Sequence, residues 1–374
     1  MSKEKIKVGI IAAEHSSDRL GAKLIESLQH IYDIDLYGLG GTEVNFSKII
    51  TPTGMDHRDL HVMGLIDPLI KLPKLLSIRR KLLKLFLEKK IDIFIGVDSP
   101  DFNMFFHKKL KSKNIKTIQL VSPSIWAWRE NRIKAIRKNI DFTICLFKFE
   151  CDFYIKKNVE SFFLGHPFNE LNQKKDQEIF TKYKLDSSKD FISILPGSRS
   201  SEISKLMPVY LKAAKKILEK NSNSFFLIPA ANKNLAKMIL SLKGINEIPY
   251  NISVNSAEDY LTLSSISIVT SGTASLEAAV LGSVPIICYK TGRLNYSILN
   301  RLIKTQLIGL PNLLLQEKIF PELIQNTLSS NSIVASYLEI LSNKDKYDFH
   351  LLKIKSLIKG EGFPAAATAI KNLL

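Results

Sequence analysis

The chain has few cysteines and no spacing among them that would suggest a metal site or a disulfide framework. Cys145, Cys151 and Cys288 make an odd number in 374 residues, which indicates a reducing compartment. The N-terminal sequence MSKEKIKVGIIAAE is too charged, and its apolar run too short, for a secretory signal peptide. No uninterrupted apolar run reaches the length of a membrane-spanning helix. These absences predict a cytoplasmic protein that is soluble or bound peripherally to a membrane.

Acidic residues are scarce relative to basic ones. The 36 Asp and Glu stand against 53 Lys and Arg, so the formal net charge is +17. This excess favours an anionic partner, which includes a nucleotide, a nucleic acid and an acidic membrane surface. Charge alone does not choose among them, because much of the excess is lysine scattered over expected helices. The sequence also lacks a Walker loop, and the glycines of residues 38–41 lack dinucleotide-binding spacing.

Short apolar segments alternate with amphipathic ones along most of the chain. Residues 7–13 and 91–97 are typical of buried strands, and residues 19–30 and 102–111 of helices. Strands separated by helices predict a parallel, doubly wound sheet. The polar, lysine-rich residues 169–190 interrupt the alternation, which then restarts. We therefore expect two Rossmann-like α/β domains facing a central cleft, joined by a polar linker.

The segment ISIVTSGTASLEAA, residues 266–279, predicts a buried strand, a small polar turn at Ser271 to Thr273, and a helix. A helix start presents unpaired N–H groups and the positive end of the helix dipole, which favour an anion. An ordinary turn with Thr273 as the helix cap is the simpler interpretation of this segment alone, since every α/β domain has several such turns.

The segment ILPGSRSSEI, residues 194–203, has the same strand–turn–helix pattern. Arg199 lies where its guanidinium could hold a phosphate through two hydrogen bonds. The alternative is a solvated Arg199 beside a helix that Ser198 or Ser200 caps. Two such units in one half of the chain favour a shared anion site.

Residues 95–102, IGVDSPDF, place Asp98 directly after a buried strand, at the sheet edge where α/β proteins bind ligands. Pro100 forces a turn, and we expect Asp101 to cap the helix that follows. Asp98 has no such structural task, which makes it a candidate general base. Solvent-facing polarity explains it about as well.

Both tryptophans lie in LVSPSIWAWRENRIKAIR, residues 120–137, and basic residues follow them at helical spacing, beginning with Arg129 and Arg132. Aromatic and basic side chains together suit single-stranded nucleic acid, an anionic substrate beside a cleft, or core tryptophans next to a solvated helix. No nucleic-acid-binding motif accompanies them, so we expect no nucleic-acid partner.

The histidines show no spacing that is typical of a metal site. His15, after Glu14, and His166 are each expected at a sheet edge, either near a ligand or in a structural role.

The segment from Val62 to Lys90 is basic and amphipathic, with eight Lys and Arg at positions 61–90. Leu75, Ile78, Leu82, Leu85 and Phe86 recur at helical spacing. Such a segment can lie in a membrane interface or form an ordinary core helix with a solvated basic face. We expect its early part at the surface and its later part in the core.

Read in order, eight segments resemble the motif series of the lipid-A-disaccharide synthases. They are IAAEHSSDRLGAKLI, VMGLIDPLIKLPKLL, IGVDSPDFN, VSPSIWAWRENR, FLGHPFNE, LPGSRSSEI, TSGTASLEA and LPNLL, between about Val8 and Leu323. The resemblance implies a GT-B fold whose last helices return to the first domain. It also implies transfer of 2,3-diacylglucosamine from UDP to the 6-hydroxyl of 2,3-diacylglucosamine 1-phosphate, with inversion.

The resemblance further assigns domains and residues. It implies a first domain of residues 1–168, with residues from about 342 to 374 packed back on it, and a donor domain of residues 169–341. Asp98 would be the general base, with no covalent nucleophile, cofactor or metal. Arg199, Ser271, Gly272, Thr273, Glu277 and Asn312 would bind UDP, with Glu277 on the ribose and the helix dipole stabilising the leaving charge.

The remaining expected site residues belong to the first domain. Glu14, His15, Trp128, Arg129 and Arg132 would line the acceptor side of the cleft, and Met63, Leu65, Ile66, Leu69, Ile70 and Leu72 would contact the cytoplasmic face of the inner membrane. A homodimer is compatible with the sequence. Ala13 and Ser17 replace two glycines that are usual in the family, which tightens the loop beside the acceptor. The alternatives are a UDP-sugar epimerase of the same fold and a basic lipid- or nucleic-acid-binding protein without catalysis.

Overall fold

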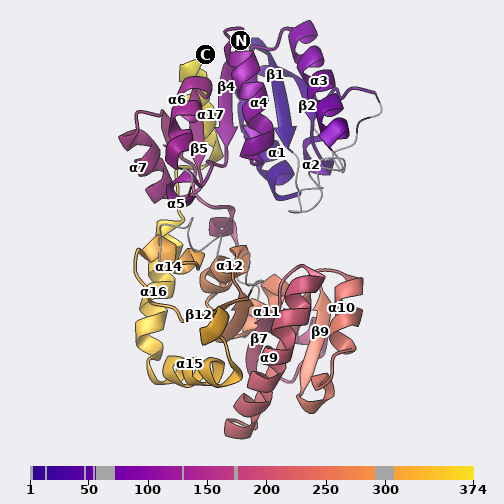
Figure 1. The fold of residues 1–374 in the computed structure, drawn as a ribbon, viewed down its shortest axis with the longest axis vertical. Coiled ribbons are helices and arrows are strands. Elements are labelled where there is room, and N and C mark those ends of the chain that lie inside the picture. The colour runs from indigo at the N-terminus through magenta and orange to yellow at the C-terminus, as the bar shows by residue number, and fades with distance from the viewer. Residues whose placement is uncertain are drawn as a thin grey trace. The chain divides into compact units, whose positions relative to one another are not determined.

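The computed structural model describes residues 3–12, 15–45, 48–53, 55, 72–128, 130–171, 176–290 and 307–374, with residues 15, 16, 42, 45, 72, 127 and 128 described by their backbone alone. The chain forms two compact units (Figure 1). The first contains residues 1–166 and 359–374, and the second contains residues 167–358. Each unit is built on a six-stranded parallel sheet with helices between successive strands.

The first unit has the strand order β2-β1-β3-β4-β5-β6. Its strands are β1 (Lys5–Ala12), β2 (Asp33–Leu39), β3 (Ile93–Val97), β4 (Lys116–Leu120), β5 (Phe142–Cys145) and β6 (Ser161–Phe163). Its helices are α1 (His15–Gln29), α2 (Thr42–Asn45), α3 (Leu72–Lys89), α4 (Pro100–Lys111), α5 (Ile125–Trp128), α6 (Ile133–Asn139), α7 (Lys148–Lys156) and α17 (Gly362–Leu373), with a short 3-10 turn at Glu130–Arg132. Strands β1, β3 and β4 are central and nearly all buried, as expected for a parallel sheet covered on both faces.

Helix α3 is the later part of the basic amphipathic segment, and it is a core helix. Ile78, Leu82 and Phe86 are buried among Phe94, Phe106 and other core residues, while Leu75 and Leu85 are half-buried at its margin. Most of its basic side chains face outward, so the basic face is solvated. The earlier residues Met63, Leu65, Ile66, Leu69 and Ile70 lie outside the described residues, and of Leu72 only the backbone, at the start of α3, is described.

The second unit has the strand order β12-β11-β10-β7-β8-β9. Its strands are β7 (Asp190–Leu195), β8 (Ser224–Ala230), β9 (Tyr250–Val254), β10 (Ile266–Thr270), β11 (Val284–Tyr289) and β12 (Glu322–Ile324). Its helices are α8 (Asp176–Tyr183), α9 (Ser200–Lys220), α10 (Lys233–Leu240), α11 (Ala257–Leu263), α12 (Thr273–Leu281), α14 (Leu310–Leu315), α15 (Ser330–Ser342) and α16 (Lys344–Leu357). Strands β7 and β10, which precede the two Gly-containing turns, are neighbours in the middle of this sheet.

Two expectations about the domain boundaries differ from the structure. The chain returns to the first unit at residue 359 rather than near 342, because α15 packs on α9 and α16 packs on α12 and α14. Only α17 belongs to the first unit, where it lies against α1. The expected linker at 169–190 also contains α8, whose Ile179 is buried and whose Lys182 pairs with Asp259 of the second unit.

Among the helices that the structure describes, none combines the length and the apolarity that crossing a membrane requires.

Candidate active site

A pocket of about 510 Å³ opens at the carboxyl edge of the second unit's sheet. Strands β7 and β10 run parallel in register there, with Ile192 beside Ile266, so the turns that follow them lie side by side. Both predicted anion-binding turns line this pocket. Its walls comprise Leu195–Arg199 and Glu202 from the β7–α9 region, Thr270–Ala274 and Glu277 from β10–α12, and Pro229–Ala231 and Asn255–Ala257 from the ends of β8 and β9.

The turn between β10 and α12 leaves the start of the helix open. Gly272 precedes the helix with φ +148°, a backbone conformation that residues other than glycine rarely adopt. Within the described residues no side chain caps α12, and Thr273, the expected cap, is instead its first helical residue. A Cβ built on Gly272 meets nothing within 4 Å, so the space in front of the helix is empty. The first N–H groups of α12 and its dipole therefore face a space that suits an anion.

The turn between β7 and α9 is closed by its own carboxylate. Glu202 Oε2 accepts hydrogen bonds from the backbone N–H of Ser198 at 3.0 Å and of Arg199 at 3.2 Å. The helix is therefore capped by Glu202 and not by Ser198 or Ser200, because the carboxylate reaches back across Gly197, whose φ of +104° bends the chain toward it. The unpaired N–H groups that could bind an anion in this pocket are therefore those at the start of α12 and not those at the start of α9.

Arg199 supplies the cation of the pocket. Its side chain is 75% exposed, and its Nη1 lies 3.3 Å from Glu202 Oε1. A single exposed ion pair of this kind contributes little to stability. The guanidinium is therefore available to turn toward a diphosphate, for which its planar fork of donors is well matched.

Glu277 lines the same pocket from the second turn of α12 and is half-buried. Burial raises the pKa of Glu277 to about 7, with a further contribution from the nearby charge of Glu258. A carboxyl group with this pKa gains and loses its proton close to neutral pH. Its oxygens can accept hydrogen bonds from hydroxyl groups such as those of a ribose.

Asn312, the sixth expected UDP ligand, does not line this pocket. It lies fully buried in α14, where its Nδ2 donates to the Phe320 carbonyl and to Glu322 Oε1, both at 2.9 Å. Its Oδ1 accepts from the backbone N–H of Ile319 and Phe320. The amide is fully used in pinning the chain between α14 and β12, so the structure corrects this assignment.

The first unit holds Asp98 at the carboxyl edge of its own sheet, directly after β3. Asp98 is half-buried, and burial raises the pKa of its carboxyl group, partly offset by a hydrogen bond from the backbone N–H of Ser99. A raised pKa suits a group that must take up a proton near neutral pH. Asp98 and Ser99 both have positive φ, 52° and 39°, an uncommon conformation that concentrates at functional sites.

Asp101 does not cap α4, contrary to the expectation. The cap position is Ser99, the helix begins at Pro100, and Asp101 lies within its first turn. The Asp101 carboxylate instead accepts a hydrogen bond from Arg132, whose side chain is exposed. Asp101 therefore ties Arg132, one of the residues expected on the acceptor side, to the helix that follows Asp98.

The other residues expected on the acceptor side are described only in part. Glu14 and Arg129 lie outside the described residues, and His15 and Trp128 are described by their backbone, at the start of α1 and the end of α5. The neighbouring Trp126 donates from Nε1 to Glu150 Oε1 at 3.1 Å, and Glu150 also accepts from Ser122 Oγ at 2.9 Å. This buried carboxylate anchors the loop between β4 and α5, and no local pattern in the sequence indicates that role.

Asn255 and Ser256 are further pocket residues that the sequence analysis did not single out. They follow β9 directly, and Asn255 has φ +56°. A polar residue immediately after a predicted strand is the signal that selected Asp98, so the same criterion would have found them.

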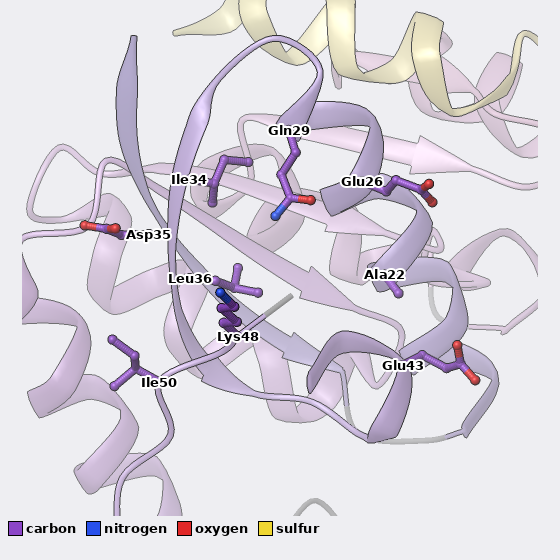
Figure 2. Close-up of a pocket in the computed structure, with 9 residues that line it drawn as sticks. All are labelled: Ala22, Glu26, Gln29, Ile34, Asp35, Leu36, Glu43, Lys48 and Ile50. Carbon is purple, nitrogen blue, oxygen red and sulfur yellow. The ribbon is translucent and has the colours of Figure 1, made fainter. Parts of the chain in front are cut away.

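A cavity of about 610 Å³ in the first unit has a different character (Figure 2). It lies along the edge strand β2 and contains none of the predicted site residues. Glu26 of α1, Asp35 of β2 and Glu43 of α2 line it against one lysine, Lys48. An anionic substrate is repelled by such a lining, which leaves the 510 Å³ pocket as the candidate donor site among the described residues.

Two relatives match this chain over nearly its whole length. Lipid-A-disaccharide synthase 2 of Legionella pneumophila (strain Paris) is 34% identical over 385 residues, covering 100% of this chain and 99% of its own. Lipid-A-disaccharide synthase of Hahella chejuensis is 33% identical over 382 residues, covering 100% of this chain and 96% of its own.

Solved structures agree on the fold. The MnaA–UDP complex from S. aureus aligns with a TM-score of 0.62 at 12% identity, covering 99% of this chain and 95% of its own. MurG from Acinetobacter baumannii aligns with a TM-score of 0.57 at 10% identity, covering 99% of each chain. At these identities the likeness concerns the fold alone, which is the GT-B fold of two parallel-sheet α/β domains.

The model of the family described as lipid-A-disaccharide synthetase matches residues 8–369. Together with the full-length relatives at 33–34% identity, this match shows that the chain belongs to the lipid-A-disaccharide synthase family, the hexosyltransferases of lipid A biosynthesis.

Proposed function

We propose that this protein condenses UDP-2,3-diacylglucosamine with 2,3-diacylglucosamine 1-phosphate, giving the β-1,6-linked disaccharide 1-phosphate and UDP. The observation that carries the proposal is the pocket at the ends of β7 and β10. It combines an uncapped helix start at Gly272, an available guanidinium at Arg199 and a carboxyl group at Glu277. These groups are complementary to a nucleoside diphosphate, which is the leaving group of the reaction.

The proposed chemistry is a single displacement. The 6-hydroxyl oxygen of the acceptor attacks the anomeric carbon of the donor, and the bond from that carbon to the UDP oxygen breaks as the new bond forms. Asp98 takes the hydroxyl proton, which makes the oxygen a better nucleophile. Negative charge develops on UDP, where the N–H groups of α12 and the guanidinium of Arg199, once turned toward the diphosphate, stabilise it. One displacement inverts the anomeric centre, so no covalent intermediate on the protein is needed.

The donor and the acceptor are held by groups on different units in this account. Ser271, Gly272 and Thr273 bind the diphosphate, and Glu277 accepts hydrogen bonds from the ribose. Glu14, His15, Trp128, Arg129 and Arg132 bind the acceptor, whose 1-phosphate pairs with one of the two arginines. This division is supported by the pocket lining in the second unit and by the Arg132–Asp101 contact beside Asp98 in the first.

We also propose that the protein works at the cytoplasmic face of the inner membrane, since both substrates carry acyl chains. The apolar residues that precede or begin the basic helix α3 in the sequence would enter the lipid interface; they are Met63, Leu65, Ile66, Leu69, Ile70 and Leu72. Flotation with vesicles containing anionic lipid tests this. Binding that is absent, or unchanged when Leu65 and Leu69 are replaced by Asp, would contradict it.

Release of UDP in the presence and absence of acceptor tests the proposed function against its same-fold alternative. A transferase releases UDP from UDP-2,3-diacylglucosamine only when 2,3-diacylglucosamine 1-phosphate is present, in equal amounts with the disaccharide. An epimerase acts on the UDP-sugar alone. UDP release that does not depend on the acceptor would refute the transferase.

Binding of a UDP-sugar should become tighter as the pH rises through about 7, because the ionised Glu277 is the better acceptor for ribose hydroxyls. At pH 6 the carboxyl group is mostly protonated in the free protein, so we expect about tenfold weaker binding than at pH 8.5. In Glu277→Gln this dependence should disappear. Calorimetric titration of both proteins across this range measures it, and equal slopes for the two would remove Glu277 from the ribose site.

A further inference from the structure

A buried polar network lies beneath Asp98 in the first unit. Gln119 in β4 is fully buried, and its Nε2 lies 2.9 Å from the carbonyl oxygen of Asp98, 3.1 Å from that of Val121 and 3.2 Å from that of Leu120. The two hydrogens of the amide are therefore shared among three carbonyls. Asp98 follows β3 and Val121 follows β4, so one side chain ties together the two turns at this sheet edge.

The carbonyl oxygen of Asp98 accepts a hydrogen bond from a second side-chain amide. Asn103 in α4 is also fully buried, and its Nδ2 donates to the Asp98 carbonyl at 2.8 Å. The backbone N–H of Asp98 donates in turn to the Leu120 carbonyl at 2.8 Å. Both backbone polar groups of Asp98 are thus fixed, one by two side chains and the other by the neighbouring strand.

These contacts hold a backbone that would otherwise relax. Asp98 and Ser99 have positive φ, and so does Val121 at 68°, which is a true outlier for a β-branched residue. Residues in this conformation persist only where their surroundings hold them. The φ of Asp98 also sets the direction of its Cβ. If the backbone relaxed to negative φ, the carboxylate would leave its present position.

His107 orients Gln119. Its Nε2 lies 2.9 Å from Gln119 Oε1, and both residues are fully buried. Because the Nε2 amide of Gln119 faces three carbonyls, its oxygen must face the histidine, and His107 Nε2 must be the donor. Burial lowers the pKa of His107 to about 4, with Gln119 and Asp141 opposing, so the ring is neutral under working conditions. The ring packs edge-on to Phe94 at 5.2 Å between centroids.

We infer that Gln119, oriented by His107, is a positioning residue for the reaction, which holds Asp98 in its left-handed conformation so that the carboxylate is directed at the acceptor hydroxyl. Neither residue reaches the substrate, and both act through the Asp98 carbonyl. The inference rests on the proposed role of Asp98 as general base.

The test compares His107→Phe with His107→Gln. Phenylalanine fits an aromatic neighbourhood but has no donor for Gln119, whereas glutamine can place an amide N–H where Nε2 now lies. His107→Phe should lower kcat by about 10- to 100-fold, as expected when a catalytic group is misplaced by about 1 Å. The KM values and UDP affinity should be unchanged. His107→Gln should recover most of the lost kcat.

Two readouts separate positioning from a general structural effect. In His107→Phe the acidic limb of the kcat–pH profile should move to lower pH, because a released carboxylate is better hydrated. In an Asp98→Ala background His107→Phe should cause no further loss, since the group that it positions is absent. A further loss there, or equal kcat for the Phe and Gln variants, would overturn the inference.

The outcome is separable from that of the proposed function. If the wild-type protein makes no disaccharide, the proposed function fails; if it does and His107→Phe matches it, only the positioning role fails. Should His107→Phe not fold, Gln119→Glu makes the same test. Ionisation of the introduced carboxyl group at alkaline pH would repel the Asp98 carbonyl, so kcat should fall as the pH rises, and a flat alkaline limb would contradict the inference.

Discussion

Asp98→Ala is expected to lower kcat by about 10³-fold while leaving the affinity for UDP within about twofold of the wild-type value. The loss follows from removing the only group proposed to accept the proton of the attacking hydroxyl. UDP affinity should persist because the pocket proposed to bind it is built from residues of the second unit. Initial rates with both substrates, and calorimetric titration with UDP, measure the two quantities.

Asp98→Asn and Asp101→Asn are the matched controls. The first keeps the shape of the side chain and loses the base, so it should be nearly as slow as Asp98→Ala. The second changes a carboxylate of the same turn that accepts from Arg132, and it should retain kcat within about tenfold because it leaves the base in place. If Asp98→Ala loses UDP binding and turnover together, Asp98 is a structural residue and not the base.

Arg199→Ala is expected to lower kcat/KM by about 10²- to 10³-fold, the range found when one preorganised donor to a developing charge is removed. Affinity for UDP should also fall, since the guanidinium is proposed to bind the diphosphate in the ground state as well. The fold should be unaffected, because the side chain is 75% exposed and its ion pair with Glu202 is weak. Thermal unfolding, kinetics and UDP titration of the variant test all three statements.

Arg199→Lys and Lys205→Ala serve as its comparisons. Lysine keeps the positive charge but not the planar fork, so activity should lie between those of wild type and Arg199→Ala. Lys205 is exposed in α9, further along the helix than Arg199, and does not line the pocket. Its loss changes the net charge equally and should have little effect. Comparable losses in Arg199→Ala and Lys205→Ala would mean that only long-range charge matters at this site.

The candidate site residues that the sequence indicated are those marked by a change in local pattern. Asp98, Arg199 and Gly272 each follow an apolar strand closely, and the carboxyl ends of parallel strands are where such folds bind ligands. Strand order then places the turns after β7 and β10 together, which the sequence only suggested through their similarity.

The parts that it missed depend on contacts between distant residues. Gln119, His107 and Glu150 lie in or beside apolar segments. Their polar groups form hydrogen bonds with residues on other elements, and the local sequence does not show these partners. Asn312 was misassigned for the same reason, since nothing in LPNLL shows that Phe320 and Glu322 use its amide. Likewise the helical pattern of residues 330–357 does not say which unit it packs against, and α15 and α16 pack on the second.

The most direct test of the central claim is the anomeric configuration of the product made by the purified protein. The two proposed substrates are incubated with it, and the disaccharide is examined by proton NMR at the newly formed linkage. A single displacement at the α-linked UDP donor, with Asp98 as base, predicts a β-1,6 linkage and one UDP released per disaccharide. An α-linked disaccharide, or the absence of any disaccharide, would contradict the account.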